Sequence, residues 1–290
     1  MWDRLPQTEG EERAQVLLEL AQDAVNRDNG SQALALAEEA RQIYSQMGAL
    51  IPGVEYARAI SGVATALGCL HRYREAAEIL DEAISLQRES NYQYVHDTLR
   101  GQGCWYYEAE NYEKALECFL ESVRILEIDG NEEFLAIDLS NAGRCYFRLQ
   151  KYPEALSILS QAREIYKGRK SLVELSGVYR DIAEAHIAAG QPEAGLRNAE
   201  NCYAIAELKK DNQYLCKGAL AKAKADMALG NFDRVADELR EADYIASNSN
   251  DWELMLEIQN EYVMLHRNLN QSDRAKEVEG RIATIREILG

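Results

Sequence analysis

Small and apolar residues recur along the chain at intervals of three, four and seven, in stretches that come in pairs. One well-defined pair runs through Gly103, Tyr106, Tyr112, Ala115 and Phe119, with a polar turn between the two stretches. Spacings of three, four and seven put side chains on one face of an α-helix, and no window alternates apolar and polar residues in the manner of a strand. The pattern therefore predicts an all-α protein built of paired helices.

The paired unit repeats at a period of about 40 residues. A second pair has the same internal spacing, from Gly143 and Tyr146 through Tyr152 to Ala155 and Leu159. The residue near the start of each second helix is small in nearly every unit: Ala33, Ala76, Ala115, Ala155, Gly195, Val235 and Ala275. Self-similarity at such a period indicates a solenoid, because one hairpin cannot bury its apolar face without a neighbour.

These motifs resemble the tetratricopeptide repeat (TPR), in which small residues let the two helices of a hairpin approach closely. The resemblance implies a right-handed α-solenoid of about seven TPR hairpins with a C-terminal capping helix. The longer period resembles the repeats of kinesin light chains, bacterial peptide-sensing regulators and STAND-class signalling ATPases. The expected hairpins are residues 13–47, 54–90, 93–130, 133–170, 172–210, 213–250 and 252–289.

The domain prediction is an N-terminal tail, 1–12, and one continuous array, 13–290. The first and seventh hairpins depart from the pattern, as terminal repeats that face water on one side do. In the last helix Ile282, Ile285 and Ile288 are expected to close the core. The few prolines fit this division: Pro6 in the tail, Pro52 between hairpins, and Pro153 and Pro192 at helix starts, where proline is tolerated.

The net charge of −17 argues against nucleic acid or an anionic membrane as a direct partner. The sequence offers no membrane-spanning stretch and no signal peptide, and its six cysteines, without a CxxC pair, are typical of reduced thiols. We therefore expect a cytoplasmic protein. No cofactor motif is present.

The resemblance implies that the first helix of each hairpin, helix A, lines a concave groove. Carried onto this sequence, the groove positions contain eight basic residues: Arg58, Arg100, Arg144, Arg148, Arg180, Lys217, Lys224 and Arg267. They contain four acidic residues: Asp97, Glu108, Glu184 and Glu257. The groove thus has an excess of positive charge in an acidic protein, and arginine suits bidentate capture of a carboxylate.

The binding hypothesis is that the groove accepts a peptide segment of acidic character, with aromatic contacts near the third to fifth hairpins. The candidate residues are Arg58, Arg100, Tyr107, Asn141, Arg144, Phe147, Arg148, Arg180, Lys217 and Lys224. The rival hypothesis is that these bases pair with nearby acids, such as Arg144 with Asp138 or Glu108 and Arg180 with Glu184. The carboxylate clamp of chaperone-binding TPR proteins is matched only in part: Arg100 and Asn141 fit, but Cys104, Gly177 and Asp181 do not.

No catalytic or metal-binding constellation is found, so the chain is expected not to be an enzyme. His71, His96, His186 and His266 fall in separate hairpins and are interpreted as packing residues. Acidic pairs recur on the second helix, helix B, and are interpreted as a solvated face: Glu38 with Glu39, Asp81 with Glu82, Glu117 with Glu121, and Glu238 with Glu241.

The leading functional prediction is a non-enzymatic scaffold or adaptor that grips a segment of another protein. Two alternatives remain open. One is a peptide-sensing regulator whose solenoid changes conformation on binding a ligand. The other is a self-assembling structural protein that forms a homodimer through a terminal hairpin.

Overall fold

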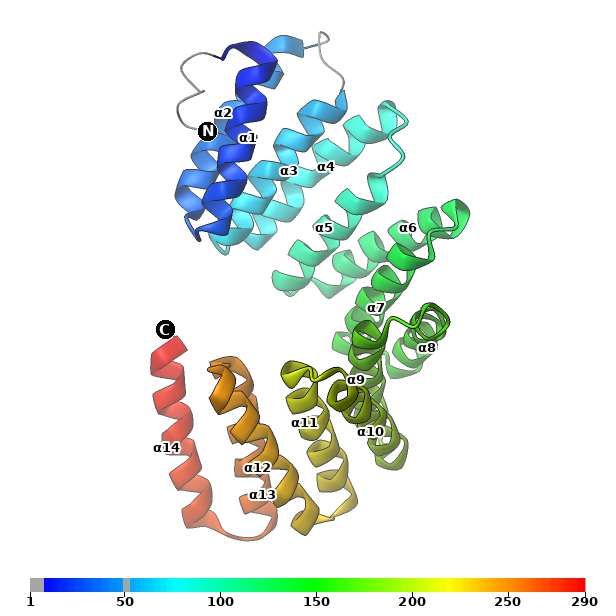
Figure 1. Cartoon of the computed structure of the whole chain (residues 1–290), viewed down its shortest axis with the longest axis vertical. Coiled ribbons are helices and arrows are strands. Elements are labelled where there is room, and N and C mark those ends of the chain that lie inside the picture. The colour runs from blue at the N-terminus through cyan, green and yellow to red at the C-terminus, as the bar shows by residue number, and fades with distance from the viewer. Residues whose placement is uncertain (1–7, 49–52, 290) are drawn as a thin grey trace. The chain divides into compact units, whose positions relative to one another are not determined.

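The computed structural model describes residues 8–48 and 53–289, and all regular structure in these segments is helical. Contacts divide the chain into two compact units, Met1–Leu149 and Gln150–Gly290. The first unit contains α1 (Gly10–Asn26), α2 (Gly30–Met47), α3 (Gly53–Cys69), α4 (Tyr73–Glu89), α5 (Val95–Glu108), α6 (Tyr112–Asp129) and α7 (Glu132–Arg148) (Figure 1). The second contains α8 (Tyr152–Arg169), α9 (Leu172–Ala188), α10 (Pro192–Lys209), α11 (Asn212–Leu229), α12 (Phe232–Ser249), α13 (Trp252–Asn268) and α14 (Ser272–Leu289). The all-α prediction is confirmed.

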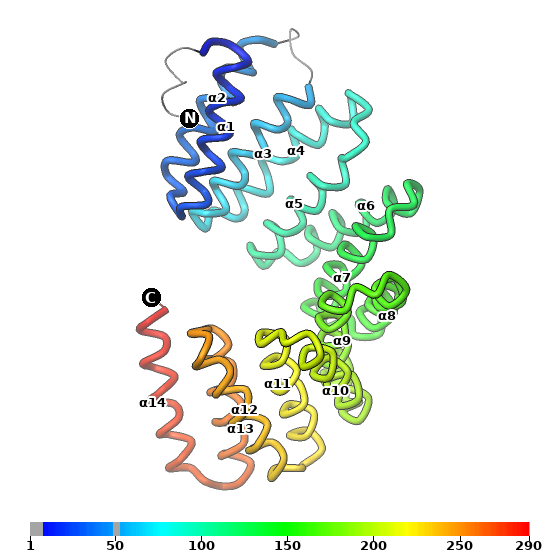
Figure 2. The backbone as a smooth tube through the Cα atoms, in the orientation of Figure 1, coloured from blue at the N-terminus to red at the C-terminus, as the bar shows by residue number. Residues whose placement is uncertain are grey.

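Each hairpin turns through one residue with a left-handed backbone. These residues have φ of 57–79° and follow the predicted period: Asp28, His71, Glu110, Gln150, Gly190, Gly230 and Asn270. In the third hairpin the N–H of Asn111 then donates to the Tyr106 carbonyl at 2.8 Å, which satisfies a carbonyl at the helix end. Within each unit the chain reverses direction at these turns (Figure 2). The repeat seen in the sequence is therefore also a repeat in backbone conformation.

The small residues at the start of each helix B are buried, as the close-approach argument predicts. Ala33 and Ala115 are fully buried, and so are their counterparts in the other hairpins with at most a few per cent exposed. A Cβ at Gly195 would lie 3.1 Å from the Ala183 carbonyl oxygen of the preceding helix. A Cβ at Gly103 would lie 2.9 Å from the Phe119 ring. Facing helices approach so closely because these positions lack larger side chains.

Within each unit the helices pack mainly on their neighbours in sequence. In the first unit α1 packs on α2, α3 on α4 and α5 on α6, and successive hairpins pack on one another through α2 with α3, α4 with α5 and α6 with α7. In the second, α9, α10 and α11 make the corresponding contacts, and α11 also packs on α9. Such stacking is that of a TPR solenoid.

The end of the chain departs in detail from the prediction. The last helix, α14, is the second helix of the seventh hairpin. Ile282 and Ile285 are buried, with 7% and 6% of their surface exposed, but Ile288 is 51% exposed. Ile288 faces away from the core because it lies on the outer side of the last helical turn. At the other end, α1 begins at Gly10, three residues before the predicted start, while Pro6 and Pro52 lie outside the described residues.

The interpretation of the histidines as packing residues is confirmed for His96, is wrong for His71, and holds in part for His186 and for His266, whose ring stacks on Tyr262. His96 is buried, but His71 is exposed. His186 and His266 are partly exposed, and each bonds through Nδ1 to a glutamine Oε1 at 2.9 Å. Their rings lie at hairpin turns, where the polar nitrogens reach turn residues instead of the core.

Candidate functional site

An aromatic and cationic cluster lies where α5, α6 and α7 meet in the first unit. The guanidinium groups of Arg144 and Arg148, one helical turn apart on α7, lie 5.5 Å and 6.0 Å from the centroid of the Tyr107 ring. Arg148 also lies 4.9 Å from the Tyr112 ring and donates to its hydroxyl. The two tyrosine rings are in edge contact, with centroids 5.2 Å apart. We call these four residues the arginine–tyrosine cluster.

Glu110 acts on Arg148 electrostatically, but no carboxylate in the described part of the chain bonds to this cluster. Among the described residues, neither Arg144 nor Arg148 forms an ion pair. Arg144 donates to the Asn141 side-chain oxygen at 2.9 Å, and its Nε is buried without a hydrogen-bond partner. Burial raises the pKa of Tyr107, against the opposing effect of the two arginines, so the phenol is neutral at pH 7. Two adjacent positive charges therefore face an aromatic surface, beside the partly buried Phe147.

Arg100, in contrast, is held by an internal carboxylate. Its Nε and Nη2 donate to the two oxygens of Asp138 at 2.6 and 3.1 Å, and Nη1 donates to Asp97 at 2.8 Å. Asp138 is fully buried and also accepts a hydrogen bond from Ser122. Burial raises the pKa of Asp138 despite the opposing effect of Arg100. For Arg100 the structure agrees with the rival hypothesis, because its guanidinium group is already bound to carboxylates of the chain itself.

The candidate residues of the second unit are also largely neutralised. Arg180 donates to its neighbour Asp181 at 2.9 Å, so the partner differs from the expected Glu184. The Lys224 ammonium lies 2.5 Å from a Glu257 oxygen and 3.9 Å from Glu184. Burial raises the pKa of Glu184, and Lys224 opposes the rise. These contacts form a local network of alternating charge.

Lys217 lies near the same network but forms no ion pair among the described residues. Its ammonium lies 5.8 Å from the centroid of the Tyr214 ring. Burial, and then the charge of Arg180, lower the pKa of Lys217.

The last two basic residues assigned to the groove, Arg58 and Arg267, each form an ion pair. Arg58 pairs with Glu55 at 2.7 Å, and Arg267 pairs with Glu279 at 2.7 Å. Of the eight bases assigned to the groove, only Arg144, Arg148 and Lys217 have no ion pair within the described segments. The positive charge thus concentrates at the arginine–tyrosine cluster.

One of the acidic pairs is not a solvated face, which corrects the sequence interpretation. Glu238 on α12 is buried, with oxygens 3.6 Å from Lys222 and 3.8 Å from Arg234. Burial raises the pKa of Glu238 to about 7. The fully buried Asp226 lies in the same cluster and accepts from Asn231 at 2.7 Å. The hairpin turn packs α11 against the part of α12 that holds Glu238. The spacing of acidic residues along helix B does not by itself predict that Glu238 is buried there.

No metal or membrane signature appears in the described segments. They hold no group of three or more histidine, cysteine or acidic side chains arranged for a metal ion. None of their helices combines the length and apolar character that a membrane span needs. All six cysteines are free, and four are buried. Burial raises the pKa of Cys118, Cys145 and Cys216 to about 12, so these thiols are not nucleophilic at neutral pH.

Sequence reasoning missed two contributors to this picture. Tyr112 belongs to the repeat motif in the sequence, and in the structure it also contacts Arg148. Asp138 was considered as a partner of Arg144 and instead binds Arg100. Tyr112 sits one hairpin before Arg148, 36 residues away, and Asp138 lies 38 residues after Arg100. A separation close to one repeat is the signal that could have identified both pairs.

Comparison with known families agrees with the helical geometry. The tetratricopeptide repeat family matches residues 55–128 and 94–168. Comparison with curated proteins finds no match. The family match therefore confirms the tetratricopeptide resemblance over the second to fourth hairpins.

Solved structures extend the likeness in fold to most of the chain. Apo RapI has a TM-score of 0.75 and 17% identity, over 94% of this chain and 97% of that one. A signal-transduction ATPase of the STAND class with a tetratricopeptide repeat sensor, from Pyrococcus horikoshii, has a TM-score of 0.73 and 17% identity, over 94% of this chain and 42% of that one. A Rap protein complexed with Competence and Sporulation Factor has a TM-score of 0.64 and 13% identity, over 99% of this chain and 78% of that one. The chain thus has the fold of a tetratricopeptide-repeat protein, and at these identities the likeness is one of fold alone.

Proposed function

We propose that this protein is a non-enzymatic scaffold that binds a peptide segment of acidic character along its helix A faces. The observation that carries the proposal is the arginine–tyrosine cluster, whose two arginines have no carboxylate partner among the described residues. Arginine donates two parallel hydrogen bonds to a carboxylate, and aromatic side chains are frequent anchors at interfaces. An acidic side chain flanked by an apolar one fits such a surface.

The internal ion pairs sharpen this proposal. Arg100, Arg180 and Lys224 are paired with acids of the chain itself, so they contribute little free charge. We therefore assign direct ligand contact to Arg144, Arg148 and Tyr107, with Asn141 holding Arg144 in place. The remaining candidates of the first unit, Arg58 and Phe147, are proposed to border the ligand, and Lys217 stays a separate candidate in the second unit.

Calorimetry with a peptide rich in Asp and Glu tests the proposal. The variant reverses both charges, Arg144→Glu with Arg148→Glu. Loss of two charge-assisted contacts, each worth about 1.5–3 kcal/mol, weakens binding at least about 100-fold. The salt dependence of the affinity also falls, since fewer charges are neutralised on binding.

A matched control separates the cluster from net charge. Reversal of the exposed Arg281 and Arg286 on α14 changes the total charge by the same amount. This control is expected to keep both affinity and salt dependence close to those of the parent protein. Equal weakening in the two variants, or none in the cluster variant, contradicts the proposal.

The second candidate function is a peptide-sensing regulator. It is supported by the fold likeness to a Rap protein solved with Competence and Sporulation Factor, a likeness that extends to fold alone at 13% identity. A sensor binds short peptides without its full-length partner and changes conformation when it does so. Calorimetry with a short-peptide library, with small-angle scattering of each bound state, distinguishes it from a passive scaffold.

Self-assembly through a terminal hairpin is a third possibility. In the described segments no large apolar residue of α1 or α2 is strongly exposed, whereas Met264, Leu269, Ile288 and Leu289 near the other end are 39–51% exposed. Sedimentation across a concentration range tests whether this end pairs two chains. We propose a cytoplasmic location, in keeping with free thiols and the absence of a membrane span among the described helices.

A further inference from the structure

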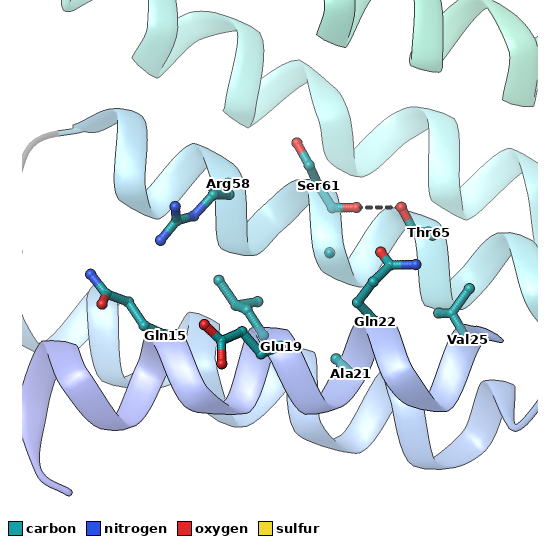
Figure 3. Close-up of a pocket in the computed structure, with 10 residues that line it drawn as sticks. Gln15, Glu19, Ala21, Gln22, Val25, Arg58, Ser61 and Thr65 are labelled. Carbon is teal, nitrogen blue, oxygen red and sulfur yellow. Dashed lines mark hydrogen bonds between the residues drawn. The ribbon is translucent and has the colours of Figure 1, made fainter. Parts of the chain in front are cut away.

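A cleft opens between α1 and α3, the helix A elements of the first two hairpins. Its volume is 510 Å³, and its apolar floor includes Leu18, Ala21 and Val25 on α1 and Gly62 on α3. A Cβ at Gly62 would lie 3.1 Å from Cδ2 of Leu18, so the missing side chain keeps this floor open. Figure 3 shows the polar residues of the two helices facing one another above it. None of the sequence motifs predicted this cleft.

The α1 rim offers mainly hydrogen-bond acceptors. Gln15, Glu19 and Gln22 lie one turn apart along the exposed side of α1. Each glutamine uses its amide nitrogen within α1, Gln15 towards Glu11 and Gln22 towards Asn26, both at 3.2 Å. Their carbonyl oxygens and the Glu19 carboxylate remain to accept from a ligand. Such a ladder suits the N–H groups of a peptide backbone.

The α3 rim of the cleft offers one strong hydrogen-bond donor, which complements the acceptors of the α1 rim. Arg58 lies opposite Gln15 and Glu19, with its charge shared by Glu55 at 2.7 Å (Figure 3). The hydroxyls of Ser61 and Thr65 donate to backbone carbonyls one turn earlier, both at 3.0 Å, and keep lone pairs for the cleft. A peptide carbonyl can therefore be bound by Arg58 while adjacent N–H groups face α1. Because Arg58 is paired with Glu55, whereas Glu19 has no ion pair within residues 8–48 and 53–289, the two rims together repel a carboxylate.

The length of the polar ladder sets the size of the occupant. Seven residues of helix separate Gln15 from Gln22, a rise of about 10.5 Å. An extended chain advances about 3.3 Å per residue, so the ladder matches about three residues. Alternate side chains of such a segment point to the floor, where Leu18 and Val25 favour aliphatic groups.

We propose that the cleft between α1 and α3 holds a neutral, extended segment of a partner peptide, about three residues long, with aliphatic side chains on the floor. The inference rests on the proposed function, in that both place a peptide on the helix A faces. It adds a second subsite in the first unit with a different preference. The acidic part of the ligand binds at the arginine–tyrosine cluster, and the uncharged aliphatic part binds between α1 and α3.

An uncharged probe tests the cleft separately from the cluster. Acetyl-Ala-Val-Leu-Ala-amide is titrated into the full chain while backbone amide chemical shifts are recorded by NMR. The expected result is saturable shifts confined to α1 and α3, centred on Gly62. Replacement of Val by Glu in the probe is expected to weaken binding at least about 10-fold, and Glu19→Gln is expected to remove most of that penalty.

A glycine pair provides the matched variants. Gly62→Leu fills the floor and is expected to abolish the shifts, whereas Gly168→Leu, at a helical glycine with no atom within 4 Å of its Cβ, leaves them unchanged. If Gly62→Leu fails to fold, Gly62→Ala replaces it, because the close contact of its Cβ is with the flexible end of Leu18 at 3.1 Å and the Ala37 Cβ lies at an ordinary 3.8 Å. This variant is expected to weaken binding several-fold.

Four outcomes overturn the inference. The first is no shift at about 10 mM peptide, and the second is shifts located on α5 and α7. The third is shifts on α1 and α3 that appear without peptide as protein concentration rises, which would make a second copy the occupant. The fourth is binding that appears only after residues 1–7 are deleted, which would make the chain's own terminus the occupant. The first, third and fourth results leave the acidic-peptide calorimetry unaffected. The second would place an uncharged peptide at the arginine–tyrosine cluster and would also count against the acidic preference, which the calorimetry with the charge-reversed variant measures separately.

Discussion

The ion pair between Arg100 and Asp138 allows a quantitative test of the distinction between structural and ligand-binding arginines. The Arg100 side chain is 17% exposed and Asp138 is fully buried, and the pair is joined by hydrogen bonds of 2.6 and 3.1 Å. Removing one member of a buried pair leaves an uncompensated charge and costs about 3–5 kcal/mol. Arg100→Met, which keeps the aliphatic stem, is therefore expected to destabilise the protein by that amount at pH 7.

Neutralising the other member provides the decisive comparison. In the double variant Arg100→Met with Asp138→Asn neither member of the pair carries a charge, and much of the lost stability is expected to return. The stability loss of Arg100→Met should also shrink as the pH falls. Without Arg100 the pKa of Asp138, already raised by burial, rises further, so the folded state takes up its proton at higher pH than the unfolded state does.

Urea denaturation followed by circular dichroism at several pH values measures these differences. Arg281→Met serves as the control, because Arg281 and Glu277 form an exposed pair at 2.8 Å, and such pairs contribute no more than about 1 kcal/mol. A loss below about 1 kcal/mol for Arg100→Met, or no recovery in the double variant, would refute the assignment of Arg100 to the interior. Arg100 would then again be a candidate for ligand contact.

Further predictions concern the core and the turns. Because burial raises the pKa of Glu238 to about 7, ionisation opposes folding as the pH rises from about 4.5 to 7, and Glu238→Gln is expected to remove up to about 3 kcal/mol of that decline in urea titrations. Gly218→Ala, whose Cβ would lie 3.0 Å from the backbone of Tyr203, is expected to cost about 1–3 kcal/mol, whereas Gly168→Ala in open space raises the melting temperature slightly. Glu110→Gly is expected to raise stability by up to about 1 kcal/mol, since its φ of 58° is unfavourable for a residue with a Cβ; a lower melting temperature would contradict this reasoning.

The sequence by itself determined the helices, their pairing and the turn positions. These features depend on contacts between residues close in the chain, so local spacing carries enough information. Ala115 is buried, and Glu110 is left-handed, because a helical hairpin closes through one tight turn with small residues at its crossing point. The same geometry recurs in every hairpin, which is why a period of 40 residues could predict helices along the whole array.

Only the tertiary structure decided which basic side chains remain available to bind a ligand. Arg100 and Arg144 occupy equivalent helix A faces, yet one binds buried Asp138 and the other lies against Tyr107 without an ion pair among the described residues. The burial of Glu238 and the cleft beside Gly62 are likewise set by packing between helices. Helical periodicity predicts on which face of a helix a residue lies. The partner it meets there depends on side-chain reach across neighbouring helices, and the sequence pattern does not encode this distance.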